Sequence, residues 1–269
     1  MTVLLDARSV TKVFGKTRAI DGISLTVEDG EVVGLIGPNG AGKTTLLSLL
    51  SGLIAPTEGS ITYDVAMAAR RPLKSCMGFA SPEMPMFDYL TGTEVMEACG
   101  AVHALPRDVT RSRTSELLAL FDLGGVGDRY VYEYSQGTRQ KLSLCAALLH
   151  DPTLVFLDEP FNGLDPTTSY RLTRLLPRLS AAGRAVVVSS HDLGLVRRVC
   201  NRVLILDAGA AVHTAELNSQ ESPPRCSASA DDDQSLEALM WRVVGEPEER
   251  RLSWIVPGPW RAASCISPS

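Results

Sequence analysis

The sequence of 269 residues lacks the features typical of membrane-spanning, secreted, zinc-ribbon and nucleic-acid-binding proteins. No stretch approaches the roughly 20 apolar residues of a transmembrane helix, and the first residues show no signal peptide. The six cysteines include no C-x-x-C pair and give no disulfide framework. Lysine and arginine do not cluster, and the formal net charge is −5, so we expect no nucleic-acid partner. Together these absences predict a cytoplasmic protein.

A glycine-rich motif is the most informative feature that is present. It consists of Gly37-Pro38-Asn39-Gly40-Ala41-Gly42-Lys43-Thr44-Thr45. It fits the phosphate-binding loop pattern G-x-x-x-x-G-K-[ST], and it lies between an apolar, β-branched run and a helical pattern. Backbone N–H groups of such a loop point at phosphate, and the following helix N-terminus favours negative charge. The motif therefore predicts that Lys43 contacts the β- and γ-phosphates of a nucleotide and that the Thr44 hydroxyl binds Mg²⁺.

A second apolar run, residues 154–157, ends in two adjacent carboxylates. In nucleotide-binding α/β folds such a strand end lies beside the phosphate-binding loop. We expect Asp158 to hold Mg²⁺, and Glu159 to orient the attacking water or accept its proton. The alternative is an acidic pair that only caps a strand, and the phosphate-binding loop upstream argues against it.

The patterning along the chain predicts an α/β fold. We expect a P-loop NTPase core with a mainly parallel sheet, an N-terminal antiparallel β subdomain and an inserted helical subdomain. The strand candidates are residues 10–14, 23–27, 31–36, 59–64, 77–80, 154–157, 185–189 and 203–206. Glu28-Asp29-Gly30 is predicted to be a tight hairpin turn.

Apolar residues at helical spacing predict the insertion, which extends over about residues 88–150. Its helices are expected at residues 93–105, 110–121 and 138–149. A further helix is predicted to start at Asp165 and Pro166, which are suited to the N-cap and to the first turn.

The motifs in their order resemble the ATP-binding subunit of ABC transporters, over residues 3 to about 245. The glycine-rich motif corresponds to Walker A and the acidic strand end to Walker B. The remaining motifs are Phe14-Gly15, Tyr134-Ser135-Gln136-Gly137-Thr138-Arg139-Gln140-Lys141 at the signature position, Gly163-Leu164-Asp165 at the D-loop, and Ser189-Ser190-His191-Asp192 at the switch-histidine loop. The resemblance implies ATP as the nucleotide and Mg²⁺ as its metal.

The resemblance also implies roles for residues that carry no signal alone. Phe14 would stack on adenine, and His191 would contact the γ-phosphate and position the attacking water. Ser135 and Gly137 would form a second anion site that meets the γ-phosphate held by an opposite subunit, and Asp165 would join that nucleotide site. Two such chains, identical or different, would sandwich two ATP molecules.

Two departures from the family pattern stand out. The signature usually reads Leu-Ser-Gly-Gly-Gln, and Tyr134, Gln136 and Thr138 replace three of its residues, a variant that resembles bacterial exporter subunits of the ABC-2 type. The Q-loop glutamine, which ligates Mg²⁺ in the family, is missing. Pro82 occupies its position, and Glu83 is the candidate substitute ligand.

Residues 1–217 are therefore expected to form an ABC ATPase domain. Residues 218–234 are rich in Ser, Pro and Asp and predict a flexible linker, followed by a helix at 235–245 and a weakly ordered tail at 246–269.

The sequence predicts an ATP-binding and ATP-hydrolysing subunit that powers a separate membrane permease. We expect the permease to be an exporter and the subunit to lie on the inner face of the cell membrane. Near the Q-loop lie the apolar residues Met84, Met86, Phe87, Tyr89 and Leu90, which either receive a permease helix or pack the subdomain interface. One rival is a soluble ABC ATPase acting on nucleic acid or the ribosome; the single cassette and the negative charge oppose it. A second is a weakly hydrolysing regulatory subunit, opposed by the presence of Glu159 and His191.

Overall fold

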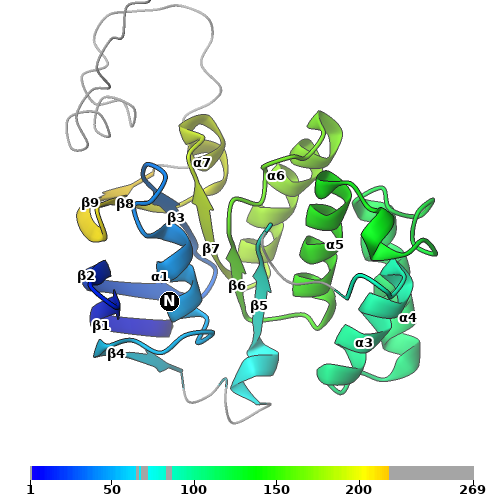
Figure 1. Ribbon diagram of the computed structural model, residues 1–269, viewed down its shortest axis with the longest axis horizontal. Helices are drawn as coiled ribbons and strands as arrows, with labels where there is room; N and C mark the ends of the chain where they lie inside the picture. Colours follow the sequence, from blue (N-terminus) through cyan, green and yellow to red (C-terminus); the bar gives the residue numbers. More distant parts are fainter. Residues whose placement is uncertain (1, 65–66, 68–71, 83–86, 218–269) are drawn as a thin grey trace, which may run out of the picture.

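The computed structural model describes residues 2–64, 67, 72–82 and 87–217 (Figure 1). Glu83, Met84 and Met86 lie outside the described residues, as do the predicted linker, C-terminal helix and tail. Within the described part of the chain, no helix is long and apolar enough to span a membrane.

The core is a six-stranded sheet with the order β5-β6-β7-β3-β8-β9. Its strands are β3 (Val32–Ile36), β5 (Met77–Ala80), β6 (Leu154–Leu157), β7 (Ala185–Ser190), β8 (Arg202–Asp207) and β9 (Ala210–Glu216). Neighbouring strands run parallel except at β9, which is antiparallel to β8. Every residue of β3, β6 and β7 is buried, which explains why β3, β6 and the first four residues of β7 are apolar runs in the sequence.

A smaller antiparallel sheet has the order β2-β1-β4, with its third strand supplied by the segment after α1. Its strands are β1 (Val3–Phe14), β2 (Thr17–Glu28) and β4 (Glu58–Tyr63). The hairpin predicted at Glu28-Asp29-Gly30 is wrong, because β3 belongs to the other sheet. Gly30 does turn the chain, with a φ of 70°. The strand after it, β3, is apolar on both faces, and such a strand is suited to the interior of a parallel sheet. The actual hairpin joins β1 to β2 at Gly15 and Lys16.

Helices cover both faces of the core sheet. They are α1 (Lys43–Leu50), α3 (Gly92–Val102), α4 (Arg107–Leu120), α5 (Gln136–Leu149), α6 (Pro166–Ala181) and α7 (Leu193–Val199). The predicted helices of the insertion are present as α3, α4 and α5, which gather beyond β5 on the side away from the antiparallel sheet (Figure 1). The expected start of α6 is also confirmed, since the Asp165 side chain accepts from the Thr168 backbone N–H.

Alternate apolar residues of the inner strands β3, β6 and β7 enter two separate apolar clusters. Val155 and Leu157 of β6 face the cluster that includes α5 and α6, whereas Leu154 and Phe156 face the cluster that includes α1 and the antiparallel sheet. The sheet therefore separates two apolar cores, and side chains packed on both of its faces hold the strand ends in place.

Candidate nucleotide-binding site

The glycine-rich motif forms the connection from β3 to α1. Gly42 lies at the N-cap of α1 with a φ of 99°, and a Cβ there would lie 2.8 Å from the Ala19 carbonyl oxygen. This position therefore requires glycine for its backbone angle and for its space. Lys43 follows, and its Nζ donates to the carbonyl oxygens of Gly37 at 2.7 Å and Pro38 at 3.2 Å. The ammonium group lies within the curve of the loop, where the sequence predicts phosphate.

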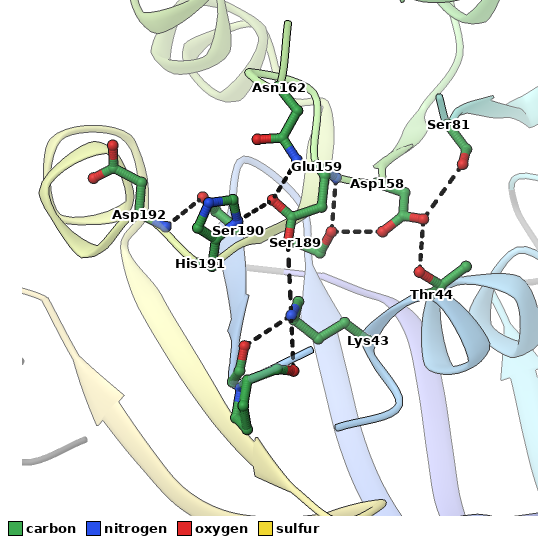
Figure 2. Close-up of polar contacts among 12 residues, drawn as sticks. Lys43, Thr44, Ser81, Asp158, Glu159, Asn162, Ser189, Ser190, His191 and Asp192 are labelled. Atoms are coloured by element: carbon green, nitrogen blue, oxygen red, sulfur yellow. Dashed lines mark hydrogen bonds and ion pairs between the residues drawn. The ribbon is translucent and has the colours of Figure 1, made fainter. Parts of the chain in front are cut away.

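The Asp158 carboxylate is buried at the end of β6 and accepts hydrogen bonds from three hydroxyl groups (Figure 2). Oδ2 accepts from Thr44 Oγ1 at 2.8 Å and from Ser81 Oγ at 3.3 Å. Oδ1 accepts from Ser189 Oγ at 2.7 Å. The predicted metal residues Thr44 and Asp158 are thus in direct contact. Sequence reasoning gave neither Ser81 nor Ser189 a role at Asp158, because Ser81, which follows β5, and Ser189 of β7 reach this carboxylate only in the folded sheet.

Glu159 faces the phosphate-binding loop from the next position along the chain. Its φ of 43° is left-handed, which costs a non-glycine residue roughly 1–2 kcal/mol. Its Oε1 lies 3.6 Å from Lys43 Nζ, and its Oε2 accepts from Asn162 Nδ2 at 3.4 Å. Among the described residues, the buried Oε1 has no hydrogen-bond partner. A buried carboxylate oxygen that accepts no hydrogen bond and lies close to a cation is suited to hold a water or take its proton.

His191 follows β7 and meets the same carboxylate. Its Nδ1 lies 2.9 Å from Glu159 Oε2, and Figure 2 shows the imidazole and Glu159 side by side. Because an ionised carboxylate only accepts, Nδ1 carries the proton in this contact. The side chain of His191 is 58% exposed, so the ring can also reach a ligand. The structure therefore brings the three predicted catalytic residues, Lys43, Glu159 and His191, into one group.

A cavity of about 480 Å³ opens above this group. It is lined by Thr17, Arg18, Ala19, Asn39, Gly40, Gly42, Lys43, Thr44, Thr45, Glu159, Ala208 and Gly209. Its volume lies within the range of small-molecule sites. The antiparallel sheet contributes Arg18 and the β8–β9 turn contributes Gly209, neither of which carries a sequence signal.

Phe14 does not line this cavity. It ends β1 with 51% of its surface exposed, and Lys12 Nζ lies 5.1 Å from its ring centre. The ring is therefore not a core aromatic, which is the default role of a lone phenylalanine. Its predicted stacking on adenine stays a prediction.

The signature and D-loop residues contact one another rather than the phosphate-binding loop. Ser135 caps α5, and its Oγ accepts from Thr138 N at 3.2 Å. A Cβ on Gly137 would collide with the Gly163 carbonyl oxygen, so the two backbones pack directly. All described contacts of Ser135 and Gly137 lie among these segments.

Asp165 is likewise held within its own chain. It accepts from Thr168 N at 2.8 Å and from Thr168 Oγ1 at 2.7 Å, and it pairs with Lys141 Nζ at 2.6 Å. The Lys141 ammonium, and then the two Thr168 hydrogen bonds, hold the pKa of Asp165 well below its usual value. The structure therefore assigns Asp165 a capping and pairing role, and its predicted contact with nucleotide stays a prediction.

A strand, a phosphate-binding loop and a helix, with an acidic strand end beside them, define a P-loop nucleotide-binding protein. A family model described as ABC transporter matches residues 20–162. The chain belongs to the ABC transporter family, as its motifs predicted.

Relatives agree with this assignment. Over 206 residues the chain is 40% identical to an uncharacterized ABC transporter ATP-binding protein of Nostoc, covering 76% of the chain and 61% of that protein. It is 33% identical to the ABC transporter ATP-binding protein NatA of Bacillus subtilis, covering 75% of this chain and 83% of that protein. It is 36% identical to the daunorubicin resistance ATP-binding protein DrrA2 of Streptomyces coeruleorubidus, covering 77% and 65%. The chain thus spans less than two thirds of the Nostoc and Streptomyces relatives.

Solved structures share the fold. An ATP-binding subunit of an ABC transporter superposes with a TM-score of 0.73 at 27% identity, covering 80% of this chain and 90% of that one. The dimeric cassette MJ0796 superposes with a TM-score of 0.72 at 25% identity, covering 80% and 99%. A further structure of MJ0796 is a post-hydrolysis dimer bound to ADP and Pi, with the same TM-score of 0.72. These likenesses confirm the predicted fold.

Proposed function

We propose that this chain binds ATP with Mg²⁺, hydrolyses it, and thereby powers a separate membrane permease of the exporter type from the cytoplasmic face. One observation carries the proposal: Lys43 and Glu159 line the cavity whose floor is the phosphate-binding loop, and His191 contacts the Glu159 carboxylate. This places a cation for phosphate beside a carboxylate for water, which is what phosphoryl transfer to water requires.

The donor set fits Mg²⁺. The Thr44 hydroxyl and the Asp158 carboxylate are hard oxygen ligands in mutual contact at 2.8 Å. One carboxylate with one hydroxyl suits Mg²⁺, which keeps several waters and takes further oxygens from phosphate. When bound, the ion would neutralise charge on the phosphate oxygens. Glu83, the proposed substitute ligand, lies outside the described residues.

The chain's own residues would bind the phosphates and position the attacking water. Lys43 and the loop N–H groups would bind the phosphates, and Glu159 Oε1 would orient a water for in-line attack on the γ-phosphate and accept its proton. His191, held through Nδ1 by Glu159, would place its other nitrogen near the γ-phosphate. Positioning and electrostatics would supply most of the rate, as in other phosphoryl transfers.

A second subunit would complete each site. Ser135 and Gly137 lie at the N-terminus of α5 and make no described contact with the phosphate-binding loop of their own chain. We assign them, with Asp165, to the nucleotide of a facing subunit, whether a second copy or a related chain. MJ0796, a cassette of the same fold whose structure is dimeric, supports the pairing of two subunits.

The exporter assignment rests on the signature variant and on relatives such as DrrA2, whose name associates it with daunorubicin resistance. For the permease contact we propose an aromatic surface before α3 and α5, formed by Phe87, Tyr89, Tyr130 and Tyr132. The ring centres of Tyr89 and Tyr132 lie 6.5 Å apart, and those of Tyr130 and Tyr132 lie 5.6 Å apart. Leu90, by contrast, packs against the core.

Capture of a partner tests this function. Tagged Glu159→Gln protein is incubated with ATP and detergent-solubilised membranes of its own cell, with Lys43→Ala as the matched control. We expect Glu159→Gln to bind ATP, turn it over slowly, and recover a polytopic membrane protein. Recovery of ribosomes or nucleic acid instead would favour the soluble ABC ATPase, and hydrolysis by Glu159→Gln at the parent rate would refute the catalytic assignment.

A further inference from the structure

Ser189 is a fully buried hydroxyl in the strand between β6 and β3. Its exposed fraction is 0%, and the preceding residues of β7 are Ala185 and three valines. A buried polar atom must find hydrogen-bond partners. Both partners of the Ser189 hydroxyl belong to the acidic pair: Oγ accepts from Glu159 N at 2.8 Å and donates to Asp158 Oδ1 at 2.7 Å (Figure 2).

Chemistry fixes the direction of both hydrogen bonds. A backbone N–H only donates, so the Ser189 oxygen accepts from Glu159 and its single proton is available to Asp158. Thr44 and Ser81 donate to the other carboxylate oxygen of Asp158. Ser189 therefore sets the rotation of the carboxylate about its bond to Cβ, and with it the direction of the oxygen that faces Thr44.

The same hydroxyl holds the backbone turn that carries Glu159. That turn is left-handed at Glu159, with a φ of 43°, and the N–H of this residue is the group that Ser189 binds. Two residues beyond Ser189, His191 Nδ1 holds Glu159 Oε2 at 2.9 Å. The end of β7 therefore supports Glu159 at its backbone and at its side chain.

We propose that Ser189 is a positioning residue for ATP hydrolysis, which orients Asp158 toward the metal and Glu159 toward the phosphate-binding loop. This inference rests on the proposed function. It assigns the strand before the switch histidine a direct link to both carboxylates.

Ser190 provides a matched control. It is the next residue of β7, it is 3% exposed, and its Oγ accepts from Asp192 N at 3.0 Å. Its described contacts include neither Asp158 nor Glu159. Ser190→Ala removes the same atom at the same depth, so it reports the cost of losing a buried hydroxyl in this strand.

The first test compares steady-state kinetics of Ser189→Ala, Ser190→Ala and Ser189→Thr. We expect kcat of Ser189→Ala to fall by about 30- to 100-fold, because small displacements at a reacting centre cost this much. KM for ATP should stay within about threefold. Ser189→Thr restores the hydroxyl and should recover most of kcat. Equal losses in Ser189→Ala and Ser190→Ala would overturn the proposal.

A double-mutant cycle tests whether Ser189 acts through Glu159. At saturating Mg²⁺, where weaker metal binding through Asp158 does not limit the rate, single-turnover hydrolysis by Ser189→Ala/Glu159→Gln should match that of Glu159→Gln within about threefold, because residues that act as a unit are not additive. A full multiplicative loss under these conditions would show that Ser189 does not act through Glu159 and would refute that part of the inference.

A binding measurement separates this inference from the proposed function. Fluorescent mant-ATP is titrated with Mg²⁺ present at increasing concentrations, and Ser189→Ala should need several-fold more Mg²⁺ for tight binding, whereas Ser190→Ala should not. If the unmodified protein bound mant-ATP without turnover, the proposed function would fail. The titration would still test whether Ser189 orients Asp158 for Mg²⁺ binding. An unchanged Mg²⁺ requirement in Ser189→Ala would refute that link.

Discussion

Lys43 places a positive charge where little water reaches it. Its side chain is 7% exposed, and its nearest described partners are two backbone carbonyls of the loop and the Glu159 carboxylate. The two carbonyl groups carry no net charge, and the Glu159 carboxylate oxygen lies 3.6 Å away, so an anion that enters the curve of the loop would stabilise the buried ammonium group further. The geometry of Lys43 alone therefore argues for an anionic ligand.

At this scale we predict that Lys43→Ala weakens mant-ATP binding by at least about tenfold, or abolishes turnover, because the phosphates lose their only side-chain cation in the loop. Lys74→Ala is the control, since Lys74 is an exposed lysine of the short helix before β5. Equilibrium fluorescence titration measures both. Equal affinities in Lys43→Ala and Lys74→Ala would remove the loop from the binding site.

The residues of the site differ in how well the sequence predicts them. Lys43 and Thr44 lie in one contiguous motif, so the sequence identifies them without knowledge of which strands pair. Ser81 and Ser189 reach Asp158 across 77 and 31 residues, and only strand pairing brings them together. Nothing in a serine at a strand end distinguishes these two from any capping serine.

At the scale of elements, α5 and α6 are joined at their N-terminal ends. Gly137 packs on the Gly163 backbone, and one turn further Lys141 pairs with Asp165. A backbone contact and an ion pair together fix the signature segment to the D-loop segment. If the two face a second subunit, as proposed, they would meet it as one unit.

We predict that Asp165→Asn lowers the thermal midpoint at pH 7 by about 2–4 °C, since asparagine keeps the cap but loses the charge that pairs with Lys141. The pKa of Asp165 is lowered in the folded chain, so its stabilisation is complete above the unfolded value of about 4 and is lost as pH falls below it. The difference in thermal midpoint between parent and variant should therefore narrow between pH 4 and pH 2. A difference in thermal midpoint that stayed constant over this pH range would contradict the ion pair between Asp165 and Lys141.

The elements themselves were largely predictable, for identifiable reasons. The run at 154–157 coincides with β6 because a strand buried on both faces leaves an unbroken apolar run. The hairpin predicted at Glu28-Asp29-Gly30 was wrong because a turn motif indicates that the chain bends there, but it does not indicate which strands pair with each other. β9 escaped prediction because this edge strand is mostly exposed and carries no apolar run.

For the whole molecule, nucleotide and permease would occupy separate surfaces. The cavity lies over β3, β6 and the antiparallel sheet, whereas the aromatic surface precedes α3 and α5 of the helical insertion. Tyr89 is 85% exposed and Tyr132 is 54% exposed, so both can change without disturbing the core.

We predict that Tyr89→Asp/Tyr132→Asp, made in the Glu159→Gln protein, abolishes recovery of the membrane partner while mant-ATP affinity stays within about twofold. Val102→Asp is the control, because Val102 is an exposed apolar residue of the same helical insertion. Undiminished recovery by the double tyrosine variant would place the permease elsewhere.

The position of β7 has a consequence for how the protein would lose activity. This strand is flanked by β6 and β3, and it carries Ser189 and ends beside His191, whereas the helical insertion packs through α5 on β5, the edge strand. Amide hydrogens of inner strands exchange with solvent only when a large cooperative unit opens, and edge elements open at lower free energy. Partial unfolding would thus release the permease-facing helices first and leave a cassette that still holds nucleotide but is disconnected from transport.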